Sequence, residues 1–89
     1  MARHRDLETV RELRDALDAD LASGRLSVGQ AVRRLREISG LSQEEFARHR
    51  GIALPTLKRI ELDKANPTVR TLERIGEVFG LKIGFVRQG

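Results

Sequence analysis

Two positively charged side chains lie close together where a helix could present them to DNA. Lys58 and Arg59 follow Pro55 by one helical turn in the stretch LPTLKRIE. On a helix whose N-terminal end enters the major groove, a lysine or arginine at this place can contact a guanine edge or a phosphate. The alternative is a basic face that meets only water. Polar side chains that could add contacts to the DNA backbone follow in the turns: Thr56, Lys64, Asn66, Thr68 and Arg70.

The sequence offers little for other chemistries. It shows no nucleophile–base pattern and no phosphate-binding glycine loop, which argues against an enzyme. There is no cysteine and there are two histidines, so no residues have metal-ligand spacing and no cofactor is expected. The missing cysteines suit a reducing cytoplasm. No apolar run approaches the roughly 20 residues of a membrane span. We therefore predict a cytoplasmic, non-enzymatic protein without metal, cofactor or membrane.

Charge is unevenly distributed along the 89 residues, whose net charge is +4. Residues 1–26 carry five Arg and six acids, a net −1, while residues 27–64 carry eight Lys or Arg against five acids, a net +3. This basic excess favours a polyanionic partner, although a basic surface exposed only to solvent fits the charge equally well. With three Phe and no Trp or Tyr, stacking on single-stranded nucleic acid is disfavoured.

Apolar spacing and capping signals predict about five helices. A stripe of apolar residues between positions 7 and 21 marks the first helix. Capping boxes begin the next two, at Ser27–Gln30 and Ser42–Glu45. A fourth helix runs from about Pro55, and a fifth follows the expected cap Thr68. The predicted fold class is therefore all-α.

The third and fourth helices are joined by a very short connection. The third stops at Gly51 and the fourth begins within four residues, which is typical of a helix-turn-helix. Glycine permits the left-handed backbone of a sharp turn, and Ile52 and Leu57 are expected to fill the angle between the helices. Because proline disfavours helical backbone in the residue before it, we expect the fourth helix to start at Pro55. A helical hairpin used only for packing would show the same spacing.

Residues 32–79 resemble the DNA-binding domains of the phage-repressor (Cro/Xre) type. The matching features are LREISGLSQEEFA, the turn glycine, TLKRIE and NPTVRTLERIGEVFG, in this order and spacing. The resemblance implies a compact repressor-like bundle over Ser27–Phe79, in which the helix from about Leu54 enters the major groove. A shorter resemblance is to HipB-like antitoxins, in which a strand in the place of LKIGFV pairs between subunits.

The Cro/Xre resemblance also assigns roles to single residues. Family members contact a phosphate from the position of Gln43 and often read bases from those of Leu54 and Pro55. Here the last two are apolar, so they can touch thymine methyls but cannot form hydrogen bonds with bases. The family pairs an arginine and a glutamate at the places of Arg36 and Glu61, which would fix the recognition helix to the bundle.

Two further positions depart from the family pattern. The family usually has Ser or Thr at the place of Ala53, so the recognition helix lacks its usual cap, and Pro55 is expected to compensate in the first turn. Arg50 stands where the family commonly has an apolar residue. Either its stem packs while its head reaches water, or the local packing differs.

The segment 81–87, LKIGFVR, alternates like a half-buried strand. No second strand is expected in the chain, so we predict antiparallel pairing with the same segment of a second subunit, with Leu81, Ile83 and Phe85 on the shared face. The alternatives are a tail that folds back on the fifth helix, and a subunit interface on the stripe of residues 7–21.

These inferences divide the chain into an N-terminal helical extension (1–26), a helix-turn-helix domain (27–80) and a C-terminal dimerisation strand (81–89). The predicted function is that of a homodimeric transcriptional regulator, or repressor, that binds a specific sequence in duplex DNA. Two recognition helices about one turn apart, roughly 34–36 Å, would match a palindromic operator. The alternative function is an antitoxin that neutralises a toxin protein and regulates its own operon.

Overall fold

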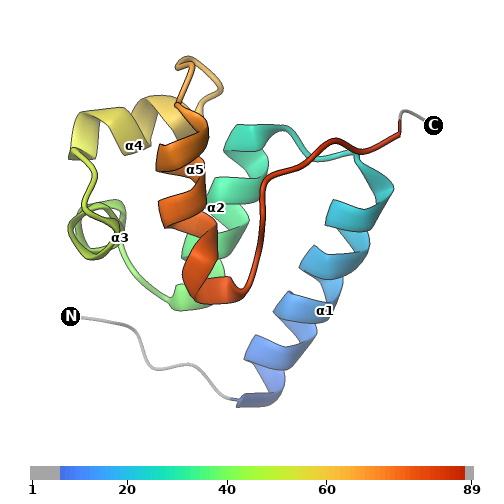
Figure 1. Cartoon of the computed structure of the whole chain (residues 1–89). Coiled ribbons are helices and arrows are strands. Elements are labelled where there is room, and N and C mark those ends of the chain that lie inside the picture. Colours follow the sequence, from blue (N-terminus) through green and yellow to red (C-terminus); the bar gives the residue numbers. More distant parts are fainter. Residues whose placement is uncertain (1–6, 88–89) are drawn as a thin grey trace.

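Five α-helices and one short 3-10 turn make up the structure, a computed structural model that describes residues 7–87 (Figure 1). The helices are α1 (Leu7–Ser23), α2 (Val28–Ser39), α3 (Gln43–Arg50), α4 (Leu54–Glu61) and α5 (Val69–Gly76), and the 3-10 turn Glu77–Phe79 follows α5 directly. The predicted all-α class is confirmed. No described helix combines the length and apolar character needed to cross a membrane, and residues 7–87 contain no cluster of three potential metal ligands.

Local sequence signals set the starts of three helices. Ser27 and Ser42 cap α2 and α3, each accepting a hydrogen bond from the backbone N–H three residues on. In return, Gln30 and Glu45 accept from the N–H groups of these two serines. Thr68 caps α5 in the same way through its hydroxyl. Both predicted capping boxes and the predicted threonine cap are therefore confirmed.

The start of α4 differs by one residue from the prediction. The N–H of Leu57 donates to the carbonyl of Ala53 at 3.0 Å, which makes Ala53 the N-cap and Leu54 the first helical residue. Ala53 makes no side-chain capping bond, as its type requires. Pro55 still lies in the first turn, where a missing N–H breaks no helical bond. The predicted start at Pro55 was wrong because this backbone bond outweighs the preference of a residue before proline.

The hydrophobic core lies among α2, α3, α4 and α5. Its most deeply buried side chains are Phe46, Leu57, Ile60 and Ile75, each no more than 1% exposed. Helix α2 packs against α1 and against α4, and α3 also packs against α4. The position of α4 is therefore fixed from two directions by its neighbours in the sequence.

The structure shows how Arg50 is accommodated at a position where the family commonly has an apolar residue. It is half-buried at the end of α3, and its Nη1 lies 3.5 Å from the carbonyl oxygen of Arg74 in α5, at the limit of a hydrogen bond. The head therefore reaches a helix carbonyl rather than water alone. A cation near the C-terminal end of α5 also complements its dipole.

Helix α1 lies against the outside of α2 and uses most of its apolar stripe for this contact. Leu17 is buried, and its neighbours along the stripe pack against the core. Leu7 is the exception, with 79% of its surface exposed. Arg34 of α2 donates to Asp20 of α1 at 2.8 Å and adds a polar link. Leu7 stays uncovered and Val10 and Leu17 also line an open groove, so the subunit interface on this stripe that the sequence allowed remains a prediction.

The expected C-terminal strand is not formed in the single chain. Among residues 7–87 no strand is present, and residues 81–87 run as an extended segment from the 3-10 turn toward the C-terminal end of α1 (Figure 1). There the side chain of Val86 lies beside Gly24. A strand needs a neighbour for its N–H and C=O groups, and the described part of the chain supplies none. The predicted pairing between subunits remains a prediction.

The three residues predicted for the dimer face are unequally exposed. Leu81 packs against the core, and its N–H donates to the carbonyl of Gly76 at 3.1 Å. Ile83 is 46% exposed and Phe85 is fully exposed. The first half of the tail, residues 81–84, therefore lies beside α5, as the alternative of a folded-back tail expected, while its outer half presents apolar side chains to solvent.

Candidate nucleic-acid interface

The turn between α3 and α4 has the geometry of a helix-turn-helix. Three residues separate the helices, and Gly51 has a left-handed backbone with φ 68°. The N–H of Ile52 donates to the carbonyl of Ala47 at 3.0 Å and closes the end of α3. A Cβ at Gly51 would meet nothing within 4 Å, so glycine is favoured there by the backbone angle and not by crowding. The predicted turn glycine is confirmed in its role.

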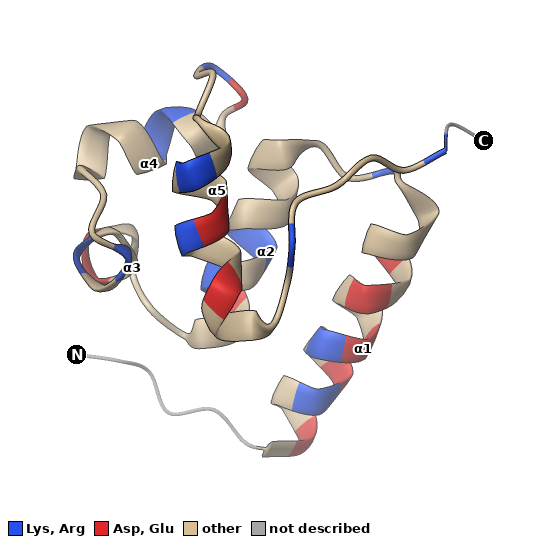
Figure 2. Ribbon diagram, viewed as in Figure 1, with Lys and Arg blue, Asp and Glu red and all other residues tan. Residues whose placement is uncertain are grey.

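Helix α4 has a buried face and an exposed face. Leu57 and Ile60 point into the core and are at most 1% exposed. The exposed face carries four predicted contact residues: Pro55, Thr56, Lys58 and Arg59. Leu54 is half-buried and packs against the core, so it offers less surface to a partner than these four. The basic residues lie toward the end of α4 that leads into the next loop (Figure 2).

Lys58 and Arg59 differ in what they already contact. The Nη2 of Arg59 donates to the carbonyl of Lys64 at 2.6 Å, and the N–H of Lys64 donates to the carbonyl of Arg59 at 2.9 Å. These two bonds close the loop that follows α4. Within residues 7–87, the ammonium of Lys58 has no hydrogen-bond or ion-pair partner. Lys58 is therefore the α4 cation whose head is free for a new contact.

The structure brings Arg36 and Glu61 together in a partly buried pair. Nε and Nη2 of Arg36 donate to the two carboxylate oxygens of Glu61 at 2.7 and 3.0 Å. Their side chains are only 17% and 5% exposed. This hydrogen-bonded carboxylate raises the pKa of Arg36 above its ordinary value. The pair joins α2 to the last residue of α4, and a bond from Arg36 to the carbonyl of Leu41 extends it toward α3.

Gln43 is the first residue of α3 and belongs to the same network. Its Nε2 donates to Glu61 at 3.2 Å. A hollow of about 450 Å³ opens beside it between α2 and α4, lined by Arg33, Arg36, Gln43, Lys58, Glu61 and Leu62. Its wall carries three cations and one carboxylate, that of Glu61, and this net positive charge together with the positive end of the α3 dipole suits a phosphate group.

Lys64 and Asn66 lie in the loop between α4 and α5, and both are exposed. Among residues 7–87 neither side chain has a hydrogen-bond or ion-pair partner. Thr68 is different, because its hydroxyl accepts from the N–H of Thr71 as the cap of α5. Of the residues predicted to brace the backbone, Thr68 is therefore the one whose hydroxyl already has a structural use.

Sequence reasoning missed a second link between α2 and the end of α4. Asp63 has a left-handed backbone with φ 56°, and its carboxylate accepts from the Oγ of Ser27 at 2.6 Å and from the N–H of Gly29 at 2.8 Å. The Ser27 hydroxyl, followed by the Gly29 N–H, lowers the pKa of Asp63 below its ordinary value. A Cβ on Gly29 would collide with the carbonyl oxygen of Ile60. A glycine in the first turn of a well-capped helix was the available signal.

Comparison with known proteins supports this geometry. Residues 32–86, more than half of the chain, match a family model described as "Helix-turn-helix". The chain belongs to the Cro/Xre-type helix-turn-helix family. The family match leaves out all of α1, which the sequence had already set apart as an N-terminal extension, and the first four residues of α2.

Two curated relatives are named as transcriptional regulators. The chain is similar to the HTH-type transcriptional regulator PuuR of Escherichia coli K12 and to that of Shigella flexneri, with 33% identity over 58 residues in each case. The match covers 65% of this chain and 31% of each relative, so the chain spans about a third of their length. No solved structure gives a significant match.

Proposed function

We propose that this protein is a transcriptional regulator that binds a specific site in duplex DNA, with α4 in the major groove. The observation that carries the proposal is the division of α4 into a face anchored by Leu57 and Ile60 and an exposed face with Pro55, Thr56 and Lys58. A helix held on one side by a core and ion pairs is a rigid element on which base contacts can be positioned.

Phosphate contacts supply most of the affinity in this proposal. The hollow beside Gln43 receives one phosphate, and Lys64 and Asn66 contact the backbone where it passes the loop after α4. Base contacts come from the exposed face of α4. Lys58 can donate to a guanine edge, while Pro55 and the methyl of Thr56 can touch thymine methyls. Arg59 holds the loop and does not read a base.

The proposal is tested by selecting bound sites from random duplexes and measuring affinity for the winning sequence against salt. If a dimer contacts on the order of 6–10 phosphates, affinity falls roughly 10³–10⁵-fold between 50 and 200 mM salt. Absence of duplex binding at low salt would refute the proposal. Binding without any enriched sequence would retain the DNA contact but refute sequence-specific regulation.

Lys58→Ala separates base contact from general charge. We expect the variant to lose roughly 5- to 150-fold in affinity for the selected site, and less on random duplex, because a good base contact contributes about 1–3 kcal/mol of discrimination. Lys82→Ala is the matched control, since it removes an exposed lysine from the tail. An equal loss on both DNAs would make Lys58 a phosphate contact instead.

We further propose a homodimer in which residues 81–87 of two chains pair as antiparallel strands on a palindromic operator. The exposed Ile83 and Phe85 support this, because pairing would cover them in both subunits. Replacing both by serine should weaken self-association at least tenfold, since a buried Phe or Ile contributes about 1.5–3 kcal/mol. Val78→Ser, which changes an exposed valine outside the segment, should leave it unchanged. A double variant as dimeric as its parent would place the interface elsewhere.

A second candidate function is that of an antitoxin whose main partner is a protein. It is favoured by the exposed apolar side chains in the outer half of the tail and by α1, which lies outside the family match. A toxin-like reading frame beside this one, and a stable complex of the two purified products, would support it. An isolated reading frame would favour the plain regulator.

A further inference from the structure

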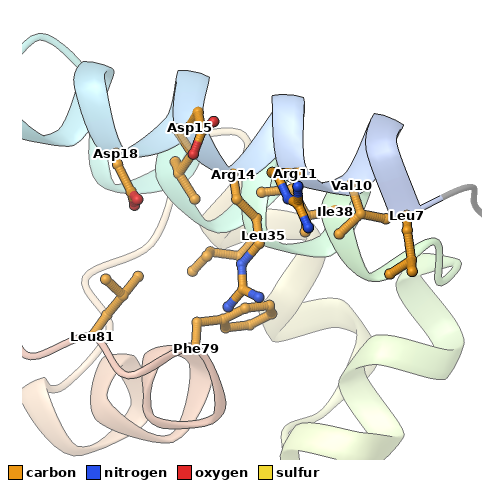
Figure 3. A pocket seen from close by; sticks show the side chains of 11 residues that line it. Leu7, Val10, Arg11, Arg14, Asp15, Asp18, Leu35, Ile38, Phe79 and Leu81 are labelled. Atoms are coloured by element: carbon orange, nitrogen blue, oxygen red, sulfur yellow. The ribbon is translucent and has the colours of Figure 1, made fainter.

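A groove of about 400 Å³ runs along α1 on the side that faces the 3-10 turn (Figure 3). Its apolar floor is formed by Leu35 and Ile38 of α2 and by Phe79 and Leu81. Its other wall is α1, from the exposed Leu7 to Asp18. We call this feature the α1 groove. Three residues of the apolar stripe of α1 also line it: Leu7, Val10 and Leu17.

Four charged side chains of α1 line the α1 groove, and their signs are segregated. Arg11 and Arg14 occupy the half near the start of the helix, and Asp15 and Asp18 the half near its end. Figure 3 shows Arg14 extending across the groove toward Phe79. Arg11 and Asp15, like Arg14 and Asp18, are four residues apart, yet the structure has no ion pair within either couple. Within residues 7–87 all four charges are free for an external partner.

This order of charges is complementary to itself when one helix is reversed. An antiparallel copy of α1, related by a two-fold axis between residues 14 and 15, places Arg14 opposite the partner's Asp15 and Arg11 opposite the partner's Asp18. The same operation places the exposed Leu7 opposite the partner's Ala22. A two-fold repeats every contact, so the interface would hold four Arg–Asp pairs.

We propose that the α1 groove is an interaction surface for a second copy of this chain, bound through its α1 in antiparallel orientation. A partner of one charge sign would be repelled by half of the groove. The chain's own tail is such a partner, because Lys82 and Arg87 are basic. Leu81 lines the groove and begins the tail, so the α1 contact adjoins the proposed strand pairing and one dimer can use both. The α1 contact does not depend on DNA binding, which is measured separately.

Disulfide crosslinking tests the register directly, because the natural chain has no cysteine. Leu7→Cys and Ala22→Cys chains are mixed in equal amounts and oxidised gently. The proposal expects the mixed disulfide to exceed either homodisulfide severalfold. The matched control is Ala16→Cys, an exposed position on the opposite side of α1, which should give little mixed disulfide with Leu7→Cys. Equal crosslinking of Leu7→Cys to both positions would overturn the proposal.

Charge reversal tests the same contact without covalent bonds. The double variant Arg11→Asp with Arg14→Asp leaves only acidic side chains among these four positions of α1. The double variant Asp15→Arg with Asp18→Arg leaves only basic ones. Each variant alone should associate more weakly than the parent, by about tenfold or more, and an equal mixture should recover the loss. Circular dichroism checks that both fold. Parent-like self-association of both variants, or a mixture no stronger than its components, would overturn the proposal.

Discussion

Removing the carboxylate of Glu61 should destabilise the whole domain, although the residue is at the edge of the candidate interface. Glu61→Ala deletes the group that accepts from Arg36 at 2.7 and 3.0 Å and from Gln43 at 3.2 Å. The guanidinium then keeps one described acceptor, the carbonyl of Leu41. A charge that is 17% exposed is left without its counter-charge, and α4 loses its link to α2.

The expected size of this effect follows from the burial of the pair. One-sided loss of a buried ion pair costs about 3–5 kcal/mol because the remaining charge is stranded. Arg36 keeps some solvent contact and one carbonyl, so we expect the lower end, about 3 kcal/mol. In a domain of this size, 1 kcal/mol shifts Tm by roughly 4–8 °C, so Tm should fall by about 12–24 °C.

Far-UV circular dichroism is the suitable assay, because the chain has no Trp or Tyr to serve as a fluorescent probe. Arg33→Ala is the control, since Arg33 lies 3.8 Å from Glu37 in a pair whose side chains are 63% and 47% exposed; it should cost about 0–0.5 kcal/mol. Arg36→Met combined with Glu61→Leu should cost less than Glu61→Ala alone. If Glu61→Ala melts within about 2 °C of the parent, the pair does not fix α4 and the reasoning is wrong.

Three further predictions concern the C-terminal end of α4 and the loop that follows it. Gly29→Ala should lower the free energy of unfolding in urea by about 1–3 kcal/mol, because the added Cβ collides with the Ile60 carbonyl and lies 2.8 Å from Asp63 Oδ1; a stabilised variant, as alanine's helix preference alone would give, contradicts this. Asp63 has a folded pKa below its unfolded value, so its stabilisation is present above about pH 3.8 and is lost as pH falls through the folded pKa. The Tm difference between parent and Asp63→Asn, which tolerates the same backbone, should shrink in acid, and a constant difference from pH 7 to pH 2.5 would count against the link. Arg59→Ala opens the bond to the Lys64 carbonyl, so it should weaken binding to selected and random DNA by similar factors; a loss confined to the selected site would make Arg59 a base contact.

Features encoded within a few residues could be predicted from the sequence. The capping boxes at Ser27 and Ser42 each involve residues three apart, so their sequence pattern is also their geometry. The turn at Gly51 is local in the same sense. The contact of Arg36 with Glu61 spans 25 residues, and the family resemblance, not periodicity, pointed to it.

Most features that depend on contacts between residues far apart in the sequence were missed. The bond from Gly29 to Asp63 joins residues 34 apart, and it requires a left-handed backbone at a non-glycine residue. Lys58 and Arg59 are neighbours of the same charge, so their difference appears only once the loop after α4 is placed. The tail is not a strand because strand formation needs a neighbouring strand, and residues 7–87 contain none.

Helix α2 contacts α4 on one side and α1 on the other. It holds α4 at both the Glu61 carboxylate and the Asp63 carboxylate, and the buried Leu57 and Ile60 add a packing contact. Its other side holds α1 through the Asp20 pair and apolar packing. A contact made on the α1 groove could therefore affect α4 only by moving α2, and several core contacts and hydrogen bonds hold α2 in place. Self-association at α1 would set the spacing between two α4 helices, which decides the distance between operator half-sites, and would leave the orientation of each α4 in its own bundle unchanged.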